Sequence, residues 1–168
     1  MDIQYCSIDS LTWPLKFDCG VHALNDYLHR HALPNHQMDI GKTTVAMTTG
    51  EKPVVVGFYT ISNAEMARIR LPEEQTRALP KYKALPAILL GRLAVDRVFK
   101  GQGYGQKLLM HALGKAANLS KEVAVNMVVV DAKDDNAISF YSKYGFISLA
   151  DNRRTLFLPI KTIREALK

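Results

Sequence analysis

The sequence lacks the long apolar runs, leader patterns and repeats that mark membrane, exported and fibrous proteins. Its longest apolar stretches, 87–90 and 123–130, are bounded or interrupted by Gly91 and Asn126 and fall far short of the ~20 residues of a membrane-spanning helix. The first residues contain Asp2 and no basic segment followed by an apolar one, so no signal peptide is expected. We find no internal repeat and no low-complexity segment. We therefore expect an ordinary globular protein with no membrane association.

Cysteine is scarce, and histidine is not arranged for metal binding. The chain has 2 cysteines, Cys6 and Cys19, whose spacing fits neither a disulfide framework nor a zinc site. A reducing cytoplasm is therefore the expected compartment. His22 and His29 are spaced to share a helix face, but no acid or cysteine completes a plausible metal triad with them. No metal site is expected.

The remaining composition is that of a single folded domain. Of 168 residues, 48% are hydrophobic and 23% are charged, which is close to ordinary globular usage. A chain of this length buries roughly two-thirds of the surface that its unfolded form exposes, so it needs no disulfide or metal to fold. We expect one domain covering residues 1–168.

Positive charge is in excess and is unevenly distributed. Lysine and arginine number 22 against 16 acids, which gives 22 − 16 = +6. Residues 97–121 contain basic side chains and no acid, and residues 152–168 contain Glu165 as their only acid. Clustered positive charge suits a polyanionic partner or a phosphate-bearing cofactor. A soluble domain that is merely basic has the same composition, and charge does not separate the two.

Hydrophobic periodicity and turn residues predict the elements of the first half of the chain. Val21, Leu24 and Leu28 indicate a helix over 20–30, which Pro34 is expected to end. Two β-branched runs, 43–49 and 54–62, form a predicted hairpin across the turn at 50–53. The other expected elements are a strand over 3–7, a strand over 66–71 and a short helix within 72–79.

The second half alternates strands and helices. An apolar strand over 86–96 leads into a glycine-rich loop, 101–105, and a helix over 104–118 follows. The apolar stripe of that helix consists of Leu108, Leu109, Ala112, Leu113 and Ala116. A buried strand is expected over 123–130, with short strands over 146–149 and 155–159. Hairpins followed by this alternation indicate a mixed α/β fold with a central sheet.

A further helix is expected between the last strands. Asp134 or Asp135 is placed to cap its start, and it should run to Lys143. Gly145 then follows at the C′ position, where a left-handed conformation ends many helices.

Two familiar phosphate-binding motifs do not fit the glycine segments. The segment 41–44 (GKTT) resembles the end of a P-loop, but His36 stands where that motif requires glycine. The segment 101–105 (GQGYG) lies between a strand and a helix, as a dinucleotide fingerprint would, but Gln106 replaces the third glycine.

The segment 100–105 (KGQGYG) instead resembles the [Gln/Arg]-x-x-Gly-x-[Gly/Ala] loop of the GNAT superfamily of N-acyltransferases, with lysine at the first position. Glycines allow a diphosphate to approach the backbone closely, and N–H groups at a helix start form an anion site. A tight turn without a ligand would need fewer glycines. The resemblance implies acetyl-CoA as the co-substrate, bound by Lys100, Gly101, Gln102, Gly103, Tyr104 and Gly105.

A second GNAT signature lies about 35 residues later. The segment 137–146 (AISFYSKYGF) resembles Ala-x-x-Phe-Tyr followed by Gly-Phe. The resemblance implies that Tyr141 is the general acid for the departing thiolate, with Tyr144 structural. A phenol has a pKa of about 10 and a thiol about 8.5, so complete transfer is uphill by roughly 2 kcal/mol. Partial donation in the transition state is sufficient.

The same resemblance assigns further contacts to the co-substrate. It implies a splayed sheet in which the backbone of Leu93, Ala94 and Val95 pairs with the pantetheine arm. Asn136 either reaches that arm or helps to start the helix that follows it. Arg92 is either a phosphate or tRNA contact or the partner of Asp96 in an ion pair.

Blocks along nearly the whole chain resemble a narrower group, the GNAT-type toxins of bacterial toxin–antitoxin modules. These blocks are 17–20 (FDCG) with Leu24 and 27–28, then 55–62 (VVGFYTIS), 89–96 (LLGRLAVD) and 130–132 (VDA). The resemblance implies acetylation of the free α-amino group of aminoacyl-tRNA, which blocks translation. It also implies a ribbon-helix-helix antitoxin and a homodimer. The residues that we assign to the tRNA backbone are Arg30, Lys42, Arg92, Arg153 and Arg154.

The chemistry of the acceptor gives separate support. A free α-amino group has a pKa of about 7.7–8.0 and a lysine side chain about 10.4, so a useful fraction of the former is already unprotonated at pH 7 whereas the latter needs far more help. The sequence shows no obvious buried base, which suits an α-amine. Two alternatives remain: a GNAT enzyme acting on a protein amine, polyamine or small amine, and a non-catalytic module that binds acyl-CoA or RNA. A basic surface disfavours polyamines, and binding alone does not require Tyr141.

Overall fold

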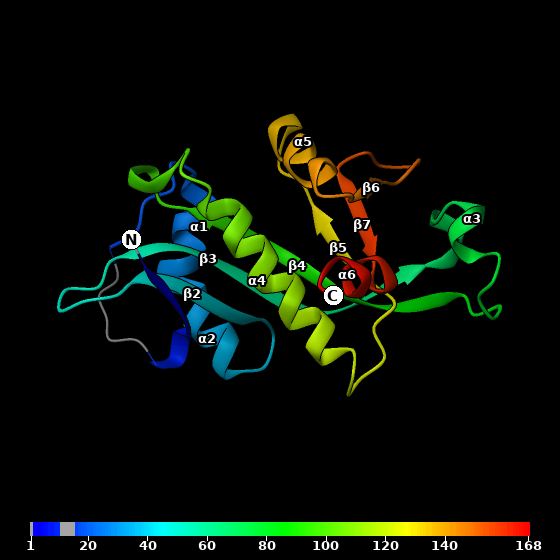
Figure 1. Ribbon diagram of the computed structural model, residues 1–168, viewed down its shortest axis with the longest axis horizontal. Helices are drawn as coiled ribbons and strands as arrows, with labels where there is room; N and C mark the ends of the chain where they lie inside the picture. Colours follow the sequence, from blue (N-terminus) through cyan, green and yellow to red (C-terminus); the bar gives the residue numbers. More distant parts are fainter. Residues whose placement is uncertain (1, 11–15) are drawn as a thin grey trace. The chain divides into compact units, whose positions relative to one another are not determined.

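The structure is a computed structural model that describes residues 2–10 and 16–168. The chain divides into two compact units, the first combining Met1–Ser62 with Gly91–Ala112 and the second combining Asn63–Leu90 with Leu113–Lys168. Strands β3 (Val55–Ala67) and β4 (Ala84–Val95) and helix α4 (Tyr104–Leu119) each contribute residues to both units (Figure 1).

Within the described residues, one seven-stranded sheet has the order β1-β2-β3-β4-β5-β7-β6. Antiparallel ladders join β1 with β2, β2 with β3, β5 with β7 and β6 with β7, whereas β4 and β5 are parallel. The prediction of a mixed α/β fold is confirmed, and the sheet is mostly antiparallel. The remaining strands are β1 (Ile3–Ser7), β2 (Lys42–Thr48), β5 (Met127–Asp131), β6 (Ile147–Ser148) and β7 (Thr155–Pro159).

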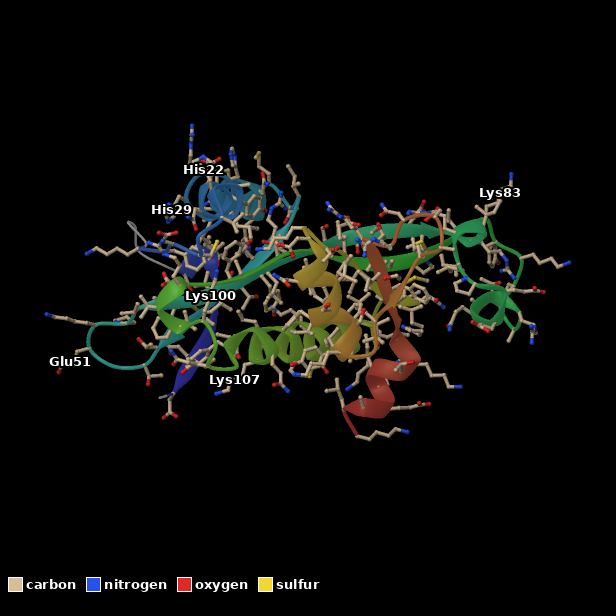
Figure 2. All side chains as sticks on the ribbon, turned by 90° about the horizontal axis from the view of Figure 1, so that it is seen from above. His22, His29, Glu51, Lys83, Lys100 and Lys107 are labelled. Atoms are coloured by element: carbon tan, nitrogen blue, oxygen red, sulfur yellow. The ribbon has the colours of Figure 1, made fainter. Side chains whose placement is uncertain are left out.

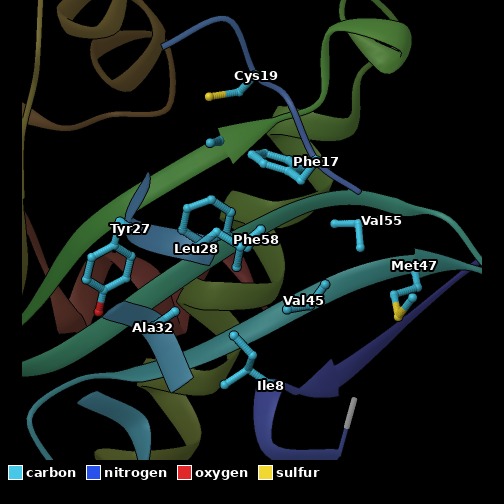
Figure 3. Close-up of a cluster of buried hydrophobic side chains, with 11 residues drawn as sticks. Ile8, Phe17, Cys19, Tyr27, Leu28, Ala32, Val45, Met47, Val55 and Phe58 are labelled. Carbon is cyan, nitrogen blue, oxygen red and sulfur yellow. The ribbon is translucent and has the colours of Figure 1, made fainter. Parts of the chain in front are cut away.

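The core of the first unit lies between its strands and its helical segment (Figure 3). The β2–β3 hairpin forms as predicted, and its strands present Val45 and Phe58 to this core. The Phe58 ring is fully buried, with the rings of Phe17 and Tyr27 at centroid distances of 5.5 and 6.4 Å. Aromatic burial of this kind contributes much of the stability of a small core.

The first helix does not end before Pro34, and that prediction is wrong. Helix α1 (His22–Asp26) continues through a π turn, η2 (Tyr27–His31), into α2 (Ala32–Gln37), which contains Pro34. The change of hydrogen-bond register restarts the helix at His31, whose φ is −115°. Pro34 therefore lies in the first turn of α2, where a missing N–H leaves no helical bond unmade.

The separate strand that we expected over 66–71 is not formed. β3 continues to Ala67, and the chain then enters a short 3₁₀ turn, η3 (Arg68–Arg70). The Arg68 guanidinium donates to the carbonyls of Thr76 at 2.7 Å, Leu79 at 3.4 Å and Pro80. These bonds draw the following segment into a compact loop around α3 (Glu73–Thr76), the short helix predicted within 72–79.

The second unit has its own core, which includes Met66, Met127, Leu149 and Phe157. Strand β5 begins at Met127, later than predicted, and Val123 is exposed. The start is fixed by Asn126, whose N–H donates to Pro86 and whose carbonyl accepts from Ile160.

The helices around this core are mostly those expected. The stripe of α4 is buried as predicted, and α5 (Asp135–Lys143) begins at Asp134, whose Oδ1 accepts from the N–H of Ala137 at 2.8 Å. Gly145 follows α5 with a φ of 95°. The pattern missed α6 (Ile160–Ala166), which is only seven residues long and buries Ile160 and Ile163.

Gly57 sets the closeness of β3, β4 and α4 in the first unit. A Cβ there would lie 2.5 Å from the Ala94 carbonyl oxygen and 2.6 Å from Leu108 Cδ1. We expect Gly57→Ala to lower the free energy of unfolding by about 2 kcal/mol or more, since the backbone must move apart. Urea denaturation measures this. Gly114→Ala is the control, because a Cβ there meets nothing within 4 Å and alanine favours a helix; equal stability of the two variants would contradict the prediction.

Candidate active site

The glycine-rich loop joins β4 to α4 in the first unit. Gly101 and Gly103 have φ values of 78° and 84°, and a Cβ on either would meet no atom within 4 Å. The rings of Phe99 and Tyr104, on either side of the loop, pack edge to face at 5.8 Å. The N–H groups at the start of the 16-residue helix α4 are thus open to an approaching anion. The loop fits a diphosphate.

The lysines beside the loop have other partners in the structure. Lys100 Nζ donates to the Cys19 carbonyl at 2.5 Å, and Lys107 Nζ lies 5.1 Å from the centre of the Tyr104 ring. Figure 2 shows both at the turn and helix that flank the loop. Gln102 Nε2 donates to the Val98 carbonyl at 3.2 Å. Phosphate contact by these three side chains stays a prediction.

Strand β4 extends past its parallel partner. The β4–β5 register runs from Ala87 opposite Met127 to Leu90 opposite Val130, whereas β4 itself continues to Val95. Leu93, Ala94 and Val95 therefore lie in the part of β4 that follows the end of this ladder. A strand edge beyond its ladder presents backbone groups that can bind an extended ligand.

Tyr141 lies in the second unit, in the last turns of α5. Its ring packs edge to face against Phe140 and Phe146, at centroid distances of 5.2 and 5.4 Å, and only 7% of the residue is exposed. Among the described residues no buried side-chain oxygen lacks a hydrogen-bond partner. The aromatic ring is therefore packed between other rings, while its hydroxyl is either hydrogen-bonded or reached by solvent.

The central part of the chain decides the family. The sequence profile described as "Acetyltransferase (GNAT) domain" matches residues 45–148, a span that contains the glycine loop, the end of β4 and Tyr141. This chain belongs to the GNAT acetyltransferase family.

Two curated relatives of this GNAT chain are described as toxins. A "tRNA-acetylating toxin" of Mycobacterium tuberculosis is 35% identical over 131 residues, which cover 78% of this chain and 76% of the relative. A "Probable toxin TacT" of Sinorhizobium fredii is 28% identical over 158 residues, covering 90% of this chain and 87% of the relative.

Solved structures with the same fold show ligands and partners. AtaT complexed with acetyl-methionyl-tRNAfMet has a TM-score of 0.91 at 32% identity and covers 99% of this chain and 100% of its own. The AtaTR complex bound with acetyl-CoA has a TM-score of 0.86 at 32% identity, covering 99% of both chains. A tyrosine-to-phenylalanine mutant of AtaT bound to the C-terminus of the antitoxin AtaR has a TM-score of 0.86 at 30% identity, covering 100% and 99%.

The burial of Tyr141 changes the proton energetics expected from the sequence. Burial raises the pKa of Tyr141 from 10.0 to about 12. Complete proton transfer to a free thiolate would then be uphill by about 5 kcal/mol rather than about 2. The phenol therefore stays protonated at neutral pH, and only partial donation in the transition state is compatible with this side chain.

The structure bears on the roles of two further residues of this helix, Asn136 and Tyr144. The cap of α5 is Asp134, so helix capping does not account for Asn136, which is exposed in the first turn. Tyr144 is the C-cap residue of α5, and its ring packs against Phe140 at 5.3 Å. This agrees with a structural role for Tyr144.

The basic residues assigned to tRNA are divided between the units, and most have acidic partners. In the first unit Arg30 Nη1 lies 3.4 Å from Asp26 Oδ1, and Lys42 Nζ lies 2.7 Å from Asp39 Oδ1. In the second unit Arg153 pairs with Asp135, and Arg154 is exposed. Contact of these residues with tRNA stays a prediction.

Arg92 contacts an aromatic ring and not the Asp96 carboxylate, while its contact with phosphate or tRNA stays a prediction. Its guanidinium carbon lies 3.6 Å from the centre of the Tyr27 ring, a cation–π contact. The Asp96 carboxylate instead accepts from the backbone N–H groups of Asp18 and Val98. The ion pair between Arg92 and Asp96 is therefore not formed.

Residues 2–10 and 16–168 contain neither a metal-binding cluster nor a membrane-spanning helix. No group of three His, Cys, Asp or Glu side chains is placed to hold a metal ion. No helix in the part of the chain described here combines the length and the apolar character needed to cross a membrane. Cys6 and Cys19 are free thiols.

Sequence reasoning missed two features near the loop. The first is a hollow of about 590 Å³ beside Gly103, lined by Lys107, Tyr5 and His111 among others. The Tyr5 and His111 rings stack with their centroids 3.8 Å apart, and His111 Nδ1 lies 2.7 Å from the Tyr59 hydroxyl. The second feature is a set of bonds between the segment 17–20 and the turn before the loop. The FDCG block was the available signal, but its residues carry no recognisable chemistry.

Gly103→Val tests the loop. Valine is strained at a φ of 84°, and its side chain would occupy the open space through which an anion approaches. We expect acetyl-CoA affinity to fall by at least about 10-fold, or about 1.4 kcal/mol, in isothermal titration calorimetry. Gly114→Ala, further along α4, is the control. Unchanged affinity in Gly103→Val would refute the loop assignment.

Alkaline unfolding tests the environment of Tyr141. The unfolded chain releases the phenol proton near pH 10, whereas the folded chain keeps it until about pH 12, so this residue destabilises the fold as pH rises between those values. As pH rises, the free energy of unfolding of Tyr141→Phe should therefore increase relative to that of wild type by up to about 1.4 kcal/mol per pH unit. Urea denaturation from pH 8 to 11 measures the difference, with Tyr82→Phe, at an exposed tyrosine, as the control. A difference that does not change with pH would contradict the assigned burial.

Proposed function

We propose that this chain is the toxin of a toxin–antitoxin module and transfers the acetyl group of acetyl-CoA to the free α-amino group of aminoacyl-tRNA, which blocks translation. The observation that carries the proposal is the full-length likeness to AtaT complexed with acetyl-methionyl-tRNAfMet. A tRNA-acetylating toxin also covers most of this chain at 35% identity. The glycine loop and Tyr141 keep the chemistry that such a reaction needs.

The chain's own residues divide the work of holding acetyl-CoA, which supplies an activated acetyl thioester when bound. The open N–H groups at the loop and the start of α4 suit its diphosphate. The backbone of Leu93, Ala94 and Val95 suits its amide-bearing arm, because the β4–β5 ladder has already ended there. Asn136, exposed in the first turn of α5, is assigned to the same arm.

Tyr141 holds the proton that the leaving thiol requires. Its phenol is protonated at neutral pH because burial raises its pKa, and the Phe140 and Phe146 rings fix its direction. The acceptor needs little help, since a useful fraction of an α-amino group with a pKa of about 7.7–8.0 is already unprotonated at pH 7. The solved structure of a relative in which a tyrosine is changed to phenylalanine supports the choice of a tyrosine for this role.

The partners follow from the same proposal. AtaT binds the C-terminus of its antitoxin AtaR. From the resemblance to the GNAT-type toxins we infer a ribbon-helix-helix antitoxin for this chain, and a cytoplasmic location where its tRNA substrate is found. We also infer a homodimer: Ile69 and Tyr82 are 93% and 67% exposed beside a hollow of about 610 Å³, a surface suited to self-association.

The decisive experiment incubates the purified protein with labelled acetyl-CoA and bulk aminoacyl-tRNA, using uncharged tRNA as the control. We expect label in RNase-sensitive material only when the tRNA is charged. Tyr141→Phe should bind acetyl-CoA normally and lose about 10²- to 10⁴-fold in turnover, the usual contribution of a general acid, whereas Tyr144→Phe should stay active. Full activity of Tyr141→Phe would remove it from the mechanism. Acetyl-CoA binding without labelled tRNA would move the acceptor to peptides or small amines.

A further inference from the structure

The glycine loop is reached through a turn whose shape depends on Asp96. This residue ends β4, and its N–H donates to the Val56 carbonyl at 2.8 Å on β3. Its side chain caps the 3₁₀ turn η4 (Arg97–Phe99), because Oδ1 accepts from the N–H of Val98 at 2.9 Å. Asp96 therefore fixes the direction in which the chain leaves the sheet and enters the loop.

A segment far away in the sequence is bonded across this turn. Asp96 Oδ2 accepts from the N–H of Asp18 at 3.0 Å, and the Asp18 carbonyl accepts from the N–H of Arg97 at 2.9 Å. Asp18 Oδ2 also lies 2.8 Å from Arg97 Nη2. Lys100 Nζ donates to the Cys19 carbonyl at 2.5 Å. We call these five residues, Asp18, Cys19, Asp96, Arg97 and Lys100, the loop clamp.

The Asp18 side chain is itself held in place. Its Oδ1 accepts from Asn25 Nδ2 at 2.9 Å and from the N–H of Gly20 at 2.8 Å, and Asn25 Oδ1 accepts from the N–H of Cys19. The hydrogen bonds from Asn25 and Gly20, with the charges of Arg97 and Lys100, lower the pKa of Asp18. The carboxylate is consequently ionised at neutral pH. One side chain thus joins the start of α1 to the turn that carries the loop.

We propose that Asp18 and Asp96 are positioning residues for acetyl-CoA, acting through the loop clamp to preorganise the glycine loop. The proposal rests on the proposed function, since it takes the loop as the diphosphate site. The loop's N–H groups converge on an anion only while Gly101 and Gly103 keep their positive φ values. A clamp on the preceding residue restricts the loop before the ligand arrives, so less binding free energy goes into ordering it.

The clamp also gives Lys100 a different task from the one that its motif position suggests. Its ammonium is directed at the Cys19 carbonyl, where it closes the clamp on the loop side. A direct phosphate contact and a clamp contact predict different behaviour of Asp18 variants. Only the clamp makes acetyl-CoA affinity depend on Asp18, which belongs to another segment of the chain.

The test compares wild type with Asp18→Asn, Asp18→Ala and Lys100→Met. Hydrogen exchange of the ligand-free protein should be at least about 10-fold faster at the amides of residues 101–105 in Asp18→Ala, with a smaller change in Asp18→Asn, whose amide oxygen still accepts a hydrogen bond. Calorimetry should show acetyl-CoA bound roughly 10-fold more weakly. The KM for acetyl-CoA should rise while kcat at saturation and the KM for aminoacyl-tRNA stay near wild type.

Asp151→Asn is the matched control, because Asp151 forms a comparably exposed pair with Arg70 at 2.9 Å. It should leave loop exchange and acetyl-CoA affinity unchanged. Asp18 variants that lose thermal stability but bind acetyl-CoA like wild type would show a purely structural bond and overturn the proposal. An effect of Lys100→Met without any effect of Asp18→Ala would overturn it in favour of a phosphate contact. Failure of wild type to bind acetyl-CoA would instead contradict the proposed function.

Discussion

The structure depends on one constraint: backbone N–H and C=O groups at the end of β4 and at the glycine loop must stay available to a ligand. A protein normally pairs its buried N–H and C=O groups, yet here β4 continues beyond its ladder with β5, and α4 begins at a glycine loop with open space above it. Their partners are then water or a ligand, and a ligand meets them at a fixed place when the neighbouring elements pack closely. Gly57 contributes to that close packing, because its missing side chain lets β3 lie close to both Ala94 and Leu108. The loop is carried on tightly packed neighbours.

Tyr141, the proposed general acid, shows the cost of holding a proton in an apolar environment. Burial keeps the Tyr141 phenol neutral and directs it, but it also raises the pKa and makes complete donation to a thiolate less favourable. The balance favours an acid that shares its proton with sulfur rather than surrendering it. That suits an acceptor α-amine, a useful fraction of which is unprotonated at neutral pH without a strong base and can give up a proton to water as the bond forms. The acceptor and the acid are therefore matched.

Local patterns predicted the parts of this fold that depend on neighbours in sequence. The stripe of α4, the cap at Asp134 and the turn at Gly145 follow from short-range rules and are confirmed. Pro34 was misjudged because a π turn resets the helix just before it, and no residue pattern announces such a turn. The loop clamp was missed for another reason: its partners lie 78 residues apart, and only the folded chain brings them together.

The acidic partners of the basic residues bear on how a polyanion would be held. Arg30, Lys42 and Arg153 each face an aspartate at the surface, and such exposed pairs contribute only about 0–1 kcal/mol each. Little is lost when a phosphate takes the place of the carboxylate, and the net charge of +6 still attracts the nucleic acid from a distance. Acid pairing therefore does not remove these side chains from tRNA binding. Each side chain then contributes only the small difference in free energy between its pair with phosphate and its pair with aspartate. Salt weakens that contribution. The affinity for tRNA would therefore come from many modest contacts and not from a single strong one.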